Sequence, residues 1–191
     1  MSTLFFFGKG SNQNALQGER VYLREPEIGD FDEWADLRQR SRAYLEKWEP
    51  TWASDEFSRF AFRHRIRIYA QRARDDEGFA FFIFDKQSNQ LLGGLTLSHV
   101  RRGVSQSATL GYWIGEQHAG KGLMKDALRT LLGVAGQRFG FHRLEAACLP
   151  HNERSSHLLL KCGFELEGFA KSYVKIAGRW EDHQLFGKVL A

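Results

Sequence analysis

The spacing of apolar residues in the N-terminal part of the chain predicts one strand followed by two helices. Val21–Arg24 alternates between apolar and polar side chains, as a half-buried strand does. Over 28–45, apolar residues recur at intervals of three and four, which is the spacing of an amphipathic helix. After a break, Ser54 is placed to cap a second helix that runs to about Ala73.

The period shortens to that of strands after the second helix and becomes helical again after Gly122. Dense apolar segments predict strands over 79–84, 91–100 and 108–114, the last two joined as an antiparallel hairpin. The C-terminal part predicts, in order, a helix from Gly122 to Gly140, a strand over 142–149, a helix capped by Asn152, and strands over 169–176 and 180–189. This order predicts an α/β fold, with a mixed sheet and helices on its faces.

Composition and charge place the chain among globular proteins. Its 191 residues, 42% of them hydrophobic, suit one domain, predicted over 18–191 after a flexible arm over 1–17. Cys148 and Cys162 are too few for a disulfide framework and are expected to be reduced thiols in a cytoplasmic protein. No apolar run approaches the roughly 18 residues needed to cross a bilayer, so no membrane partner is predicted. The formal net charge of +4 is a mild bias toward acidic partners.

The most informative segment runs from Gly111 to Leu123, where a buried strand leads through a glycine-rich loop into a long helix. The first N–H groups of a helix have no partner within it and carry partial positive charge. Gly120 and Gly122 let the backbone approach a bulky anion, and Lys121 adds a charge at the rim. The segment predicts a pyrophosphate cradle, although its spacing matches neither a P-loop nor a dinucleotide-binding fingerprint. The alternative is a tight turn that merely needs two glycines before a helix.

Two motifs in a fixed order resemble the GNAT acetyltransferase superfamily. Residues 117–122 (Gln-His-Ala-Gly-Lys-Gly) resemble its acyl-coenzyme A signature. Residues 151–155 (His-Asn-Glu-Arg-Ser), followed by 158–164, resemble its second conserved block. Further matches at 48–50 and 180–183 resemble the ribosomal-protein-alanine N-acetyltransferases of the RimJ type in particular. The resemblance covers nearly the whole chain.

The resemblance implies a mostly antiparallel sheet of about seven strands with a splayed central parallel pair, formed here by 108–114 and 142–149. The gap between these two strands would admit acetyl-coenzyme A. An amine would attack the thioester directly, with a backbone N–H near Tyr112 or Trp113 acting on the thioester carbonyl. The implied cofactor-binding residues are Tyr112, Trp113, Ile114, Gln117, Gly120, Lys121, Gly122, Leu123, Asn152 and Ser155.

The resemblance leaves two proton transfers to assign. It gives Ser155 or Tyr173 as the proton donor to the departing thiolate. The simpler interpretation of Ser155 is a polar residue in the first turn of a helix, and that of Tyr173 is an aromatic residue packed on a strand. The carboxylates that serve as base in some relatives are absent, because Thr109 and Val174 occupy those positions. An N-terminal α-amine, with a pKa near ~8, is already partly neutral at cellular pH. The general base therefore stays open between ordered water and four side chains: Glu116, Glu181, Asp182 and His183. For Asp182 the favoured interpretation is structural, a hydrogen bond that ties the last hairpin.

Two further regions carry candidate contacts with partners. By resemblance, Trp48 and Glu49 line the acceptor groove, where Glu49 would attract a substrate ammonium; the alternative is a structural loop. Arg59, Arg63 and Arg67 recur at four-residue steps on the second helix and could meet ribosomal RNA, although a solvated helix face is the simpler interpretation. The histidines and cysteines lack zinc spacing, so no metal is predicted.

We therefore predict an N-terminal protein acetyltransferase whose acceptor is a ribosomal protein that begins with Ala or Ser, acting as a monomer or homodimer. One alternative is an acetyltransferase for a small-molecule amine or antibiotic, which would differ only in its acceptor groove. Another is a non-catalytic module that binds coenzyme A or RNA. The intact glycine-rich loop argues against the last of these.

Overall fold

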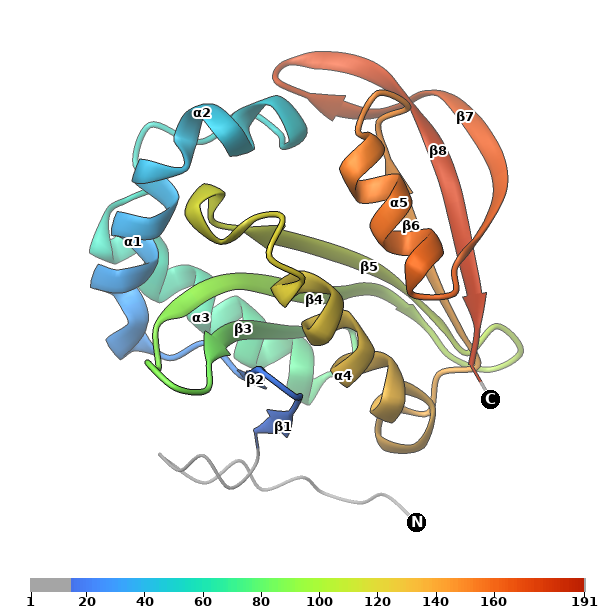
Figure 1. Cartoon of the computed structure of the whole chain (residues 1–191), viewed down its shortest axis with the longest axis horizontal. Coiled ribbons are helices and arrows are strands. Elements are labelled where there is room, and N and C mark those ends of the chain that lie inside the picture. The colour runs from blue at the N-terminus through green and yellow to red at the C-terminus, as the bar shows by residue number, and fades with distance from the viewer. Residues whose placement is uncertain (1–14, 191) are drawn as a thin grey trace.

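An eight-stranded sheet forms the centre of the structure, a computed structural model that describes residues 15–190 (Figure 1). The strands follow the order β1-β2-β3-β4-β5-β6-β8-β7, and every neighbouring pair is antiparallel except β5 and β6. The strands are β1 (Leu16–Gln17), β2 (Val21–Arg24), β3 (Phe79–Asp85), β4 (Leu91–Arg101), β5 (Ser107–Ile114), β6 (Arg143–Cys148), β7 (Glu165–Ile176) and β8 (Arg179–Val189).

Helices cover both faces of the sheet, as the sequence predicted (Figure 1). On one face, α4 (Leu123–Phe139) and α5 (Glu153–Lys161) enclose the larger apolar core. On the other, α1 (Phe31–Arg40) and α3 (Arg59–Arg74) pack in a second core that is rich in aromatic side chains. The short elements are α2 (Arg42–Leu45) and 3₁₀ turns at Ile28–Asp30, Glu46–Trp48 and Glu116–His118.

The parallel pair of strands separates after three residues. Positions 107–109 of β5 pair with 143–145 of β6, and beyond them the two strands no longer pair with each other. β5 continues to Ile114 along β4, while β6 continues to Cys148 along β8. The sheet therefore opens in its middle, which confirms the predicted splay and leaves backbone groups of both strands facing the gap.

The hairpin of β7 and β8 reaches across this opening towards the segment that follows α2 (Figure 1). Its two-residue turn places both Ala177 (φ 45°) and Gly178 (φ 84°) in the left-handed region, as a type I′ turn requires. The Ala177 N–H donates to the Glu49 carbonyl at 3.1 Å. One hydrogen bond thus links the two sides of the opening at its rim.

Two predictions for the N-terminal half are corrected by the structure. The helix predicted over 28–45 is wrong as one element, because Ser41 interrupts it between α1 and α2. Ser41 is almost fully buried, and its Oγ accepts the Glu116 N–H at 3.0 Å, a partner that no local pattern reveals. The predicted cap Ser54 is also wrong. Ser58 caps α3 instead, accepting the N–H of Ala61 at 3.0 Å.

The ends of the chain differ from the prediction in two respects. β7 begins at Glu165, ahead of the predicted start at 169. Most of the predicted arm over 1–17 lies outside the described residues, but Leu16–Gln17 forms strand β1, which pairs with β2. Within residues 15–190, none of the helices combines the length and the apolar character that a membrane span requires.

A glycine at the centre of the sheet gives a stability prediction. A Cβ on Gly93 of β4 would overlap the Trp113 carbonyl of β5, whereas a Cβ on Gly133 of α4 would meet open space. Gly93→Ala is expected to lower the free energy of unfolding by roughly 1–3 kcal/mol through overpacking. Gly133→Ala, the matched control, is expected to raise it by about 0.4–1 kcal/mol. Urea denaturation measures both, and equal effects at the two sites would contradict the close strand approach.

Candidate active site

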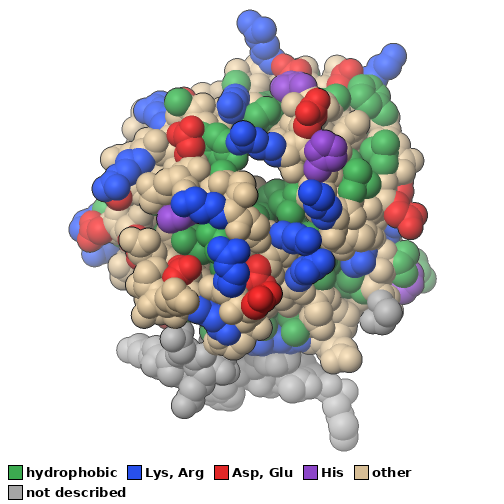
Figure 2. Space-filling model, viewed as in Figure 1, with side chains coloured by type: hydrophobic (Ala, Val, Ile, Leu, Met, Phe, Trp, Pro, Cys, Tyr) green, Lys and Arg blue, Asp and Glu red, His purple; other side chains and the backbone are tan. Residues whose placement is uncertain are grey.

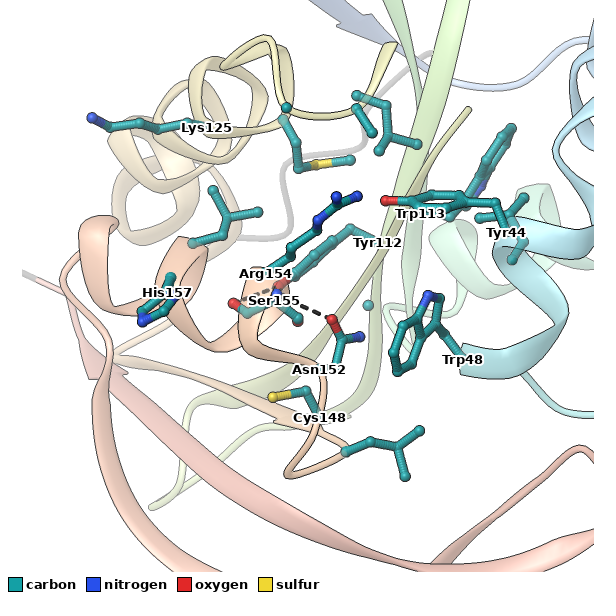
Figure 3. A pocket seen from close by; sticks show the side chains of 18 of the residues that line it. Tyr44, Trp48, Tyr112, Trp113, Lys125, Cys148, Asn152, Arg154, Ser155 and His157 are labelled. Carbon is teal, nitrogen blue, oxygen red and sulfur yellow. Dashed lines mark hydrogen bonds between the residues drawn. The ribbon is translucent and has the colours of Figure 1, made fainter. Parts of the chain in front are cut away.

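A cavity of about 680 Å³ occupies the opening between β5 and β6. The start of α4, the first turns of α5, the end of β6 and the segment around α2 form its walls (Figure 3). In the space-filling view the molecule is hollowed at this place, and Lys and Arg side chains gather beside the hollow (Figure 2). The cavity is therefore a ready site for a negatively charged ligand that reaches into the sheet.

The glycine-rich loop has the geometry of an anion cradle. Gly120 (φ 74°) and Gly122 (φ 79°) are both in the left-handed region, and a Cβ on Gly120 would meet nothing within 4 Å. Within the described part of the chain, the N–H groups from Gly120 to Lys125 donate no hydrogen bond, and no side chain caps α4. The loop and the positive end of the helix therefore present six free donors, an arrangement that suits an anion.

Two residues that the sequence did not single out hold this loop in place. Both carboxylate oxygens of Asp126 accept backbone N–H groups from the turn before β2, those of Glu19, Arg20 and Val21, at 2.7–3.2 Å. Arg20 in turn donates from Nη1 to the Lys121 carbonyl at 3.0 Å. The turn before β2 is thus fastened to the loop from outside. No periodic pattern marks such contacts, because they join residues more than 100 positions apart.

The positive side chains at the cavity differ from those predicted. Lys121 and Gln117 are exposed and lie outside the cavity lining; the Gln117 amide instead contacts the ring of His118. Cations from the two flanking helices line the cavity in their place, namely Lys125, Arg154 and Lys161. Lys125 lies one helical turn beyond the loop, a position that could have been found by extending the loop argument to the first turn of α4.

A hydroxyl pair lies where the gap meets the first turn of α5 (Figure 3). The Tyr112 hydroxyl and Ser155 Oγ are 2.7 Å apart, and Asn152 Oδ1 accepts the Ser155 N–H, which confirms the predicted cap. Burial raises the pKa of the Tyr112 phenol well above its usual value, so this group stays protonated. Burial also raises the pKa of the neighbouring Cys148 thiol. The pair is a neutral proton donor in the half-buried wall of the cavity.

Tyr173, the other predicted donor, does not line the cavity. It lies on β7 with 51% of its surface exposed, and its ring packs 5.8 Å from the ring of His183. His183 is buried and does line the cavity. The structure therefore brings Ser155 to the gap and leaves Tyr173 behind an intervening histidine.

The four candidate bases occupy different places. Ser172 donates its N–H to Asp182 Oδ1 at 2.8 Å, so Asp182 ties β7 to β8 as the favoured interpretation held. Glu116 and Glu181 lie outside the cavity lining. His183 Nδ1 is 3.0 Å from the Glu181 carbonyl, which can only accept, so Nδ1 carries the proton and Nε2 is the free acceptor of the neutral ring.

The wall opposite the loop is built around a buried arginine. Arg38 of α1 is 5% exposed and binds Glu49 through both guanidinium ends, at 2.9 and 2.7 Å. Trp52 donates its indole N–H to the same carboxylate, and the Arg38 guanidinium also lies over the Trp113 ring. Glu49 was predicted to attract a substrate ammonium. Because Arg38 and Trp52 already occupy both of its oxygens, this carboxylate instead fixes the wall.

Trp48 lies on the same wall and faces the cavity (Figure 3). Its ring packs 5.5 Å from that of His151, which precedes α5. Tyr44 lines the cavity from α2 as well. The cavity wall formed by the α2 segment is therefore aromatic, whereas the wall formed by α4 is rich in free backbone N–H groups and positive charge.

Comparisons with known proteins agree with this geometry. The chain matches a family model described as an acetyltransferase (GNAT) domain over residues 20–165. It is 36% identical to a probable N-acetyltransferase, YjcK, of Bacillus subtilis, over 89% of this chain and 94% of that protein. It is 35% identical to the [ribosomal protein uS5]-alanine N-acetyltransferase of Escherichia coli, over 94% and 93%. The solved structure of Mycobacterium smegmatis RimJ, in complex with CoA-disulfide, has a TM-score of 0.84 at 29% identity, covering 88% of this chain and 81% of that one.

The buried arginine of the cavity wall gives a second prediction. Arg38→Leu leaves the partly buried carboxylate of Glu49 without its cation, so we expect the free energy of unfolding to fall by about 3–5 kcal/mol. The control, Arg40→Leu, removes an exposed arginine of the same helix that pairs with Asp36, and is expected to change it by less than about 0.5 kcal/mol. Chemical denaturation measures both variants. Similar losses would show that burial does not set the strength of the Arg38 contact.

Proposed function

Because the chain belongs to the GNAT acetyltransferase family, we propose that it acetylates the N-terminal α-amine of a protein, with acetyl-coenzyme A as the donor. The observation that carries this proposal is the row of free N–H groups from Gly120 to Lys125, which opens into the same cavity as the aromatic wall. The acceptor we propose is a ribosomal protein that begins with Ala or Ser. Support comes from the 35% identity to a [ribosomal protein uS5]-alanine N-acetyltransferase.

The residues of the α4 side fit the diphosphate of coenzyme A. Free N–H groups at the start of α4 supply donors and partial positive charge, and Gly120 leaves the space that an anion needs. Lys125, Arg154 and Lys161 add charge around the same mouth. Beyond Thr109, the edge of β5 that faces the gap is not paired with β6, so its backbone groups can bind the amides of an extended arm. Acetyl-coenzyme A supplies the activated acetyl group.

The aromatic side receives the amine. An α-amine with a pKa near ~8 is partly neutral at cellular pH, so the enzyme needs only to accept one proton as the N–C bond forms. Of the four candidate bases, His183 has the best placement, since it lines the cavity and its Nε2 is the free acceptor. Trp48 and Tyr44 exclude water from the approaching chain end.

The hydroxyl pair serves the departing sulfur. As the C–S bond breaks, Ser155 Oγ donates its proton to the thiolate, and the Tyr112 hydroxyl, 2.7 Å away, orients Oγ through a hydrogen bond. The proton that the amine loses replaces the one that Ser155 gives up. The raised pKa of Tyr112 keeps the phenol protonated, so it remains a hydrogen-bond partner of Ser155 throughout the working range. The β5 backbone beside Tyr112 can stabilise the charge on the carbonyl oxygen.

Peptide acetylation tests the proposed function. We expect purified protein with acetyl-coenzyme A to release thiol when given short peptides that begin with Ala or Ser, and mass spectrometry to find the acetyl group on the α-amine. The same peptides with a blocked N-terminus are expected to be inert. Release with small amines or amino acids alone would overturn the protein acceptor, and binding of coenzyme A without turnover would overturn catalysis.

A matched pair of glycine variants belongs to this test. Gly120→Glu places a carboxylate in the anion cradle and is expected to abolish binding of coenzyme A in calorimetry. Gly103→Glu is the control, because Gly103 also has a positive φ (64°) and open space around it but lies in the turn between β4 and β5. Backbone strain is therefore common to both variants, and only Gly120→Glu introduces charge at the loop.

Kinetics of two hydroxyl variants separate the two donors. Ser155→Ala is expected to lower kcat about 10²-fold with little change in affinity for coenzyme A, whereas Tyr173→Phe, outside the cavity, is expected to keep kcat within twofold. Equal losses of kcat in the Ser155 and Tyr173 variants would contradict the assignment to Ser155.

The pH profile of the wild type gives a further check. We expect kcat/KM to rise with pH as the α-amine of the peptide deprotonates near ~8. It should show no fall before about pH 10, because the pKa of Tyr112 is raised.

A further inference from the structure

Helix α3 carries an unusual distribution of charge. Its 16 residues, Arg59–Arg74, include six arginines and one histidine and no acidic residue. One face of the helix packs against the aromatic core through Phe62. The opposite face is exposed to solvent and does not contact the cavity.

The six arginines fall into two groups by their contacts. Arg59 pairs with Asp32 at 2.6 Å, and Arg65 pairs with Glu56 at 2.8 Å. In contrast, the side chains of Arg63, Arg67 and Arg72 make no ion pair or hydrogen bond with any residue of the described chain, and Arg74 bonds only to the neutral side chain of Gln71. Arg59, which the sequence placed first in the basic stripe, is therefore already neutralised.

Three of the four uncompensated arginines lie along one line of the helix, and the fourth, Arg72, lies on the other side of the axis. At about 100° per residue, Arg63, Arg67 and Arg74 fall within roughly 40° of one another around the axis and extend over about 17 Å along it. Phe60 begins the same exposed face, and its ring is 80% exposed. We call this surface, made of Phe60, Arg63, Arg67 and Arg74, the basic face of α3.

We propose that the basic face of α3 binds the phosphate backbone of RNA, with Phe60 as a stacking surface for an unpaired base. Planar guanidinium groups bind phosphate through paired hydrogen bonds, and a line of them with no acid between them matches a polyanion. An exposed aromatic ring beside a basic groove is the arrangement that proteins use for single-stranded nucleic acid.

A membrane surface fits this face less well. A helix that lies in a lipid interface buries a continuous apolar face. The apolar face of α3 is already packed against the sheet, so only Phe60 and the partly exposed Ile68 remain.

The position of α3 allows RNA to bind while the cavity is occupied. α3 covers the face of the sheet opposite α4, so the basic face and the anion cradle lie on different sides of the molecule (Figure 1). Glu56 links α3 to the cavity wall that is built around Arg38, because its carboxylate contacts both Arg65 and Arg38. Binding of RNA to this face does not depend on the acetylation that we propose. The further statement that this RNA is ribosomal, and so brings the N-terminus of the acceptor protein to the cavity, rests on the proposed function.

Binding of a 12-nucleotide single-stranded RNA to the full-length protein, followed by fluorescence anisotropy over a salt series, tests this inference. With three phosphate contacts, the plot of log K against log salt should have a slope of about −2. Arg63→Gln/Arg67→Gln should reduce the slope to about −0.7 and weaken binding roughly 25-fold at about 0.1 M salt. Phe60→Ala should weaken binding without changing the slope, since stacking releases no counterion.

Two controls separate the basic face from general charge. Arg138→Gln/Lys175→Gln removes two exposed cations that lie on other elements than α3, namely α4 and β7, and should leave affinity within twofold. Arg63→Lys/Arg67→Lys keeps the charge and should keep the slope. No binding of RNA by the wild type, equal losses in the two Gln variants, or binding only to vesicles containing phosphatidylserine would overturn the inference.

Acetylation of a free peptide, measured on the same preparations, distinguishes this inference from the proposed function. Arg63→Gln/Arg67→Gln should acetylate peptides like the wild type and lose activity only on assembled ribosomal particles. A protein that binds RNA through α3 but acetylates no peptide would leave the inference intact and refute the proposed function. A protein that acetylates peptides and binds no RNA would do the reverse.

Discussion

The separation of two parallel strands is the constraint on which the site depends. β5 and β6 pair over three residues and then follow different neighbours, so hydrogen bonding cannot close the sheet between them. Backbone N–H and C=O groups that face the gap need other hydrogen-bond partners, which a polar ligand or water can provide. The same divergence brings the start of α4, which follows β5, and the start of α5, which follows β6, to one opening. Two helix N-termini therefore face a single gap.

Charge is arranged so that each side of this gap suits one reactant. The α4 side combines free N–H groups with Lys125, Arg154 and Lys161, and so attracts an anion. On the α2 side, Arg38 neutralises Glu49, and the Lys47 ammonium lies beside the rings of Tyr44 and Trp48. A wall on which the carboxylate is already paired lets an amine approach as the free base, whereas an unpaired carboxylate would favour the ammonium form, which cannot attack.

The sequence was informative wherever a feature depends on neighbours along the chain. The glycine-rich loop, the cap at Asn152 and the order of strands follow from local spacing, and the structure confirms them. Features that join distant segments could not be predicted in this way. Ser41, where the predicted helix is interrupted, accepts the N–H of Glu116, and Asp126 holds a turn more than 100 residues earlier in the chain. The pairing of Glu49 with Arg38, which changed the interpretation of a predicted site residue, belongs to the same class.

The arginines of this chain show how burial decides what a charge does. Arg38 has little contact with water and must be paired, so it holds a wall in one geometry and contributes no free charge. Arg154 lines the cavity from the first turn of α5 with no ion pair to the described residues, which leaves its charge available to a ligand. Arg63 is exposed on a helix that carries no acid, and there its charge acts on the surroundings of the protein. Sequence shows three equal cations, and only their surroundings give them a structural, a ligand-binding and a surface role.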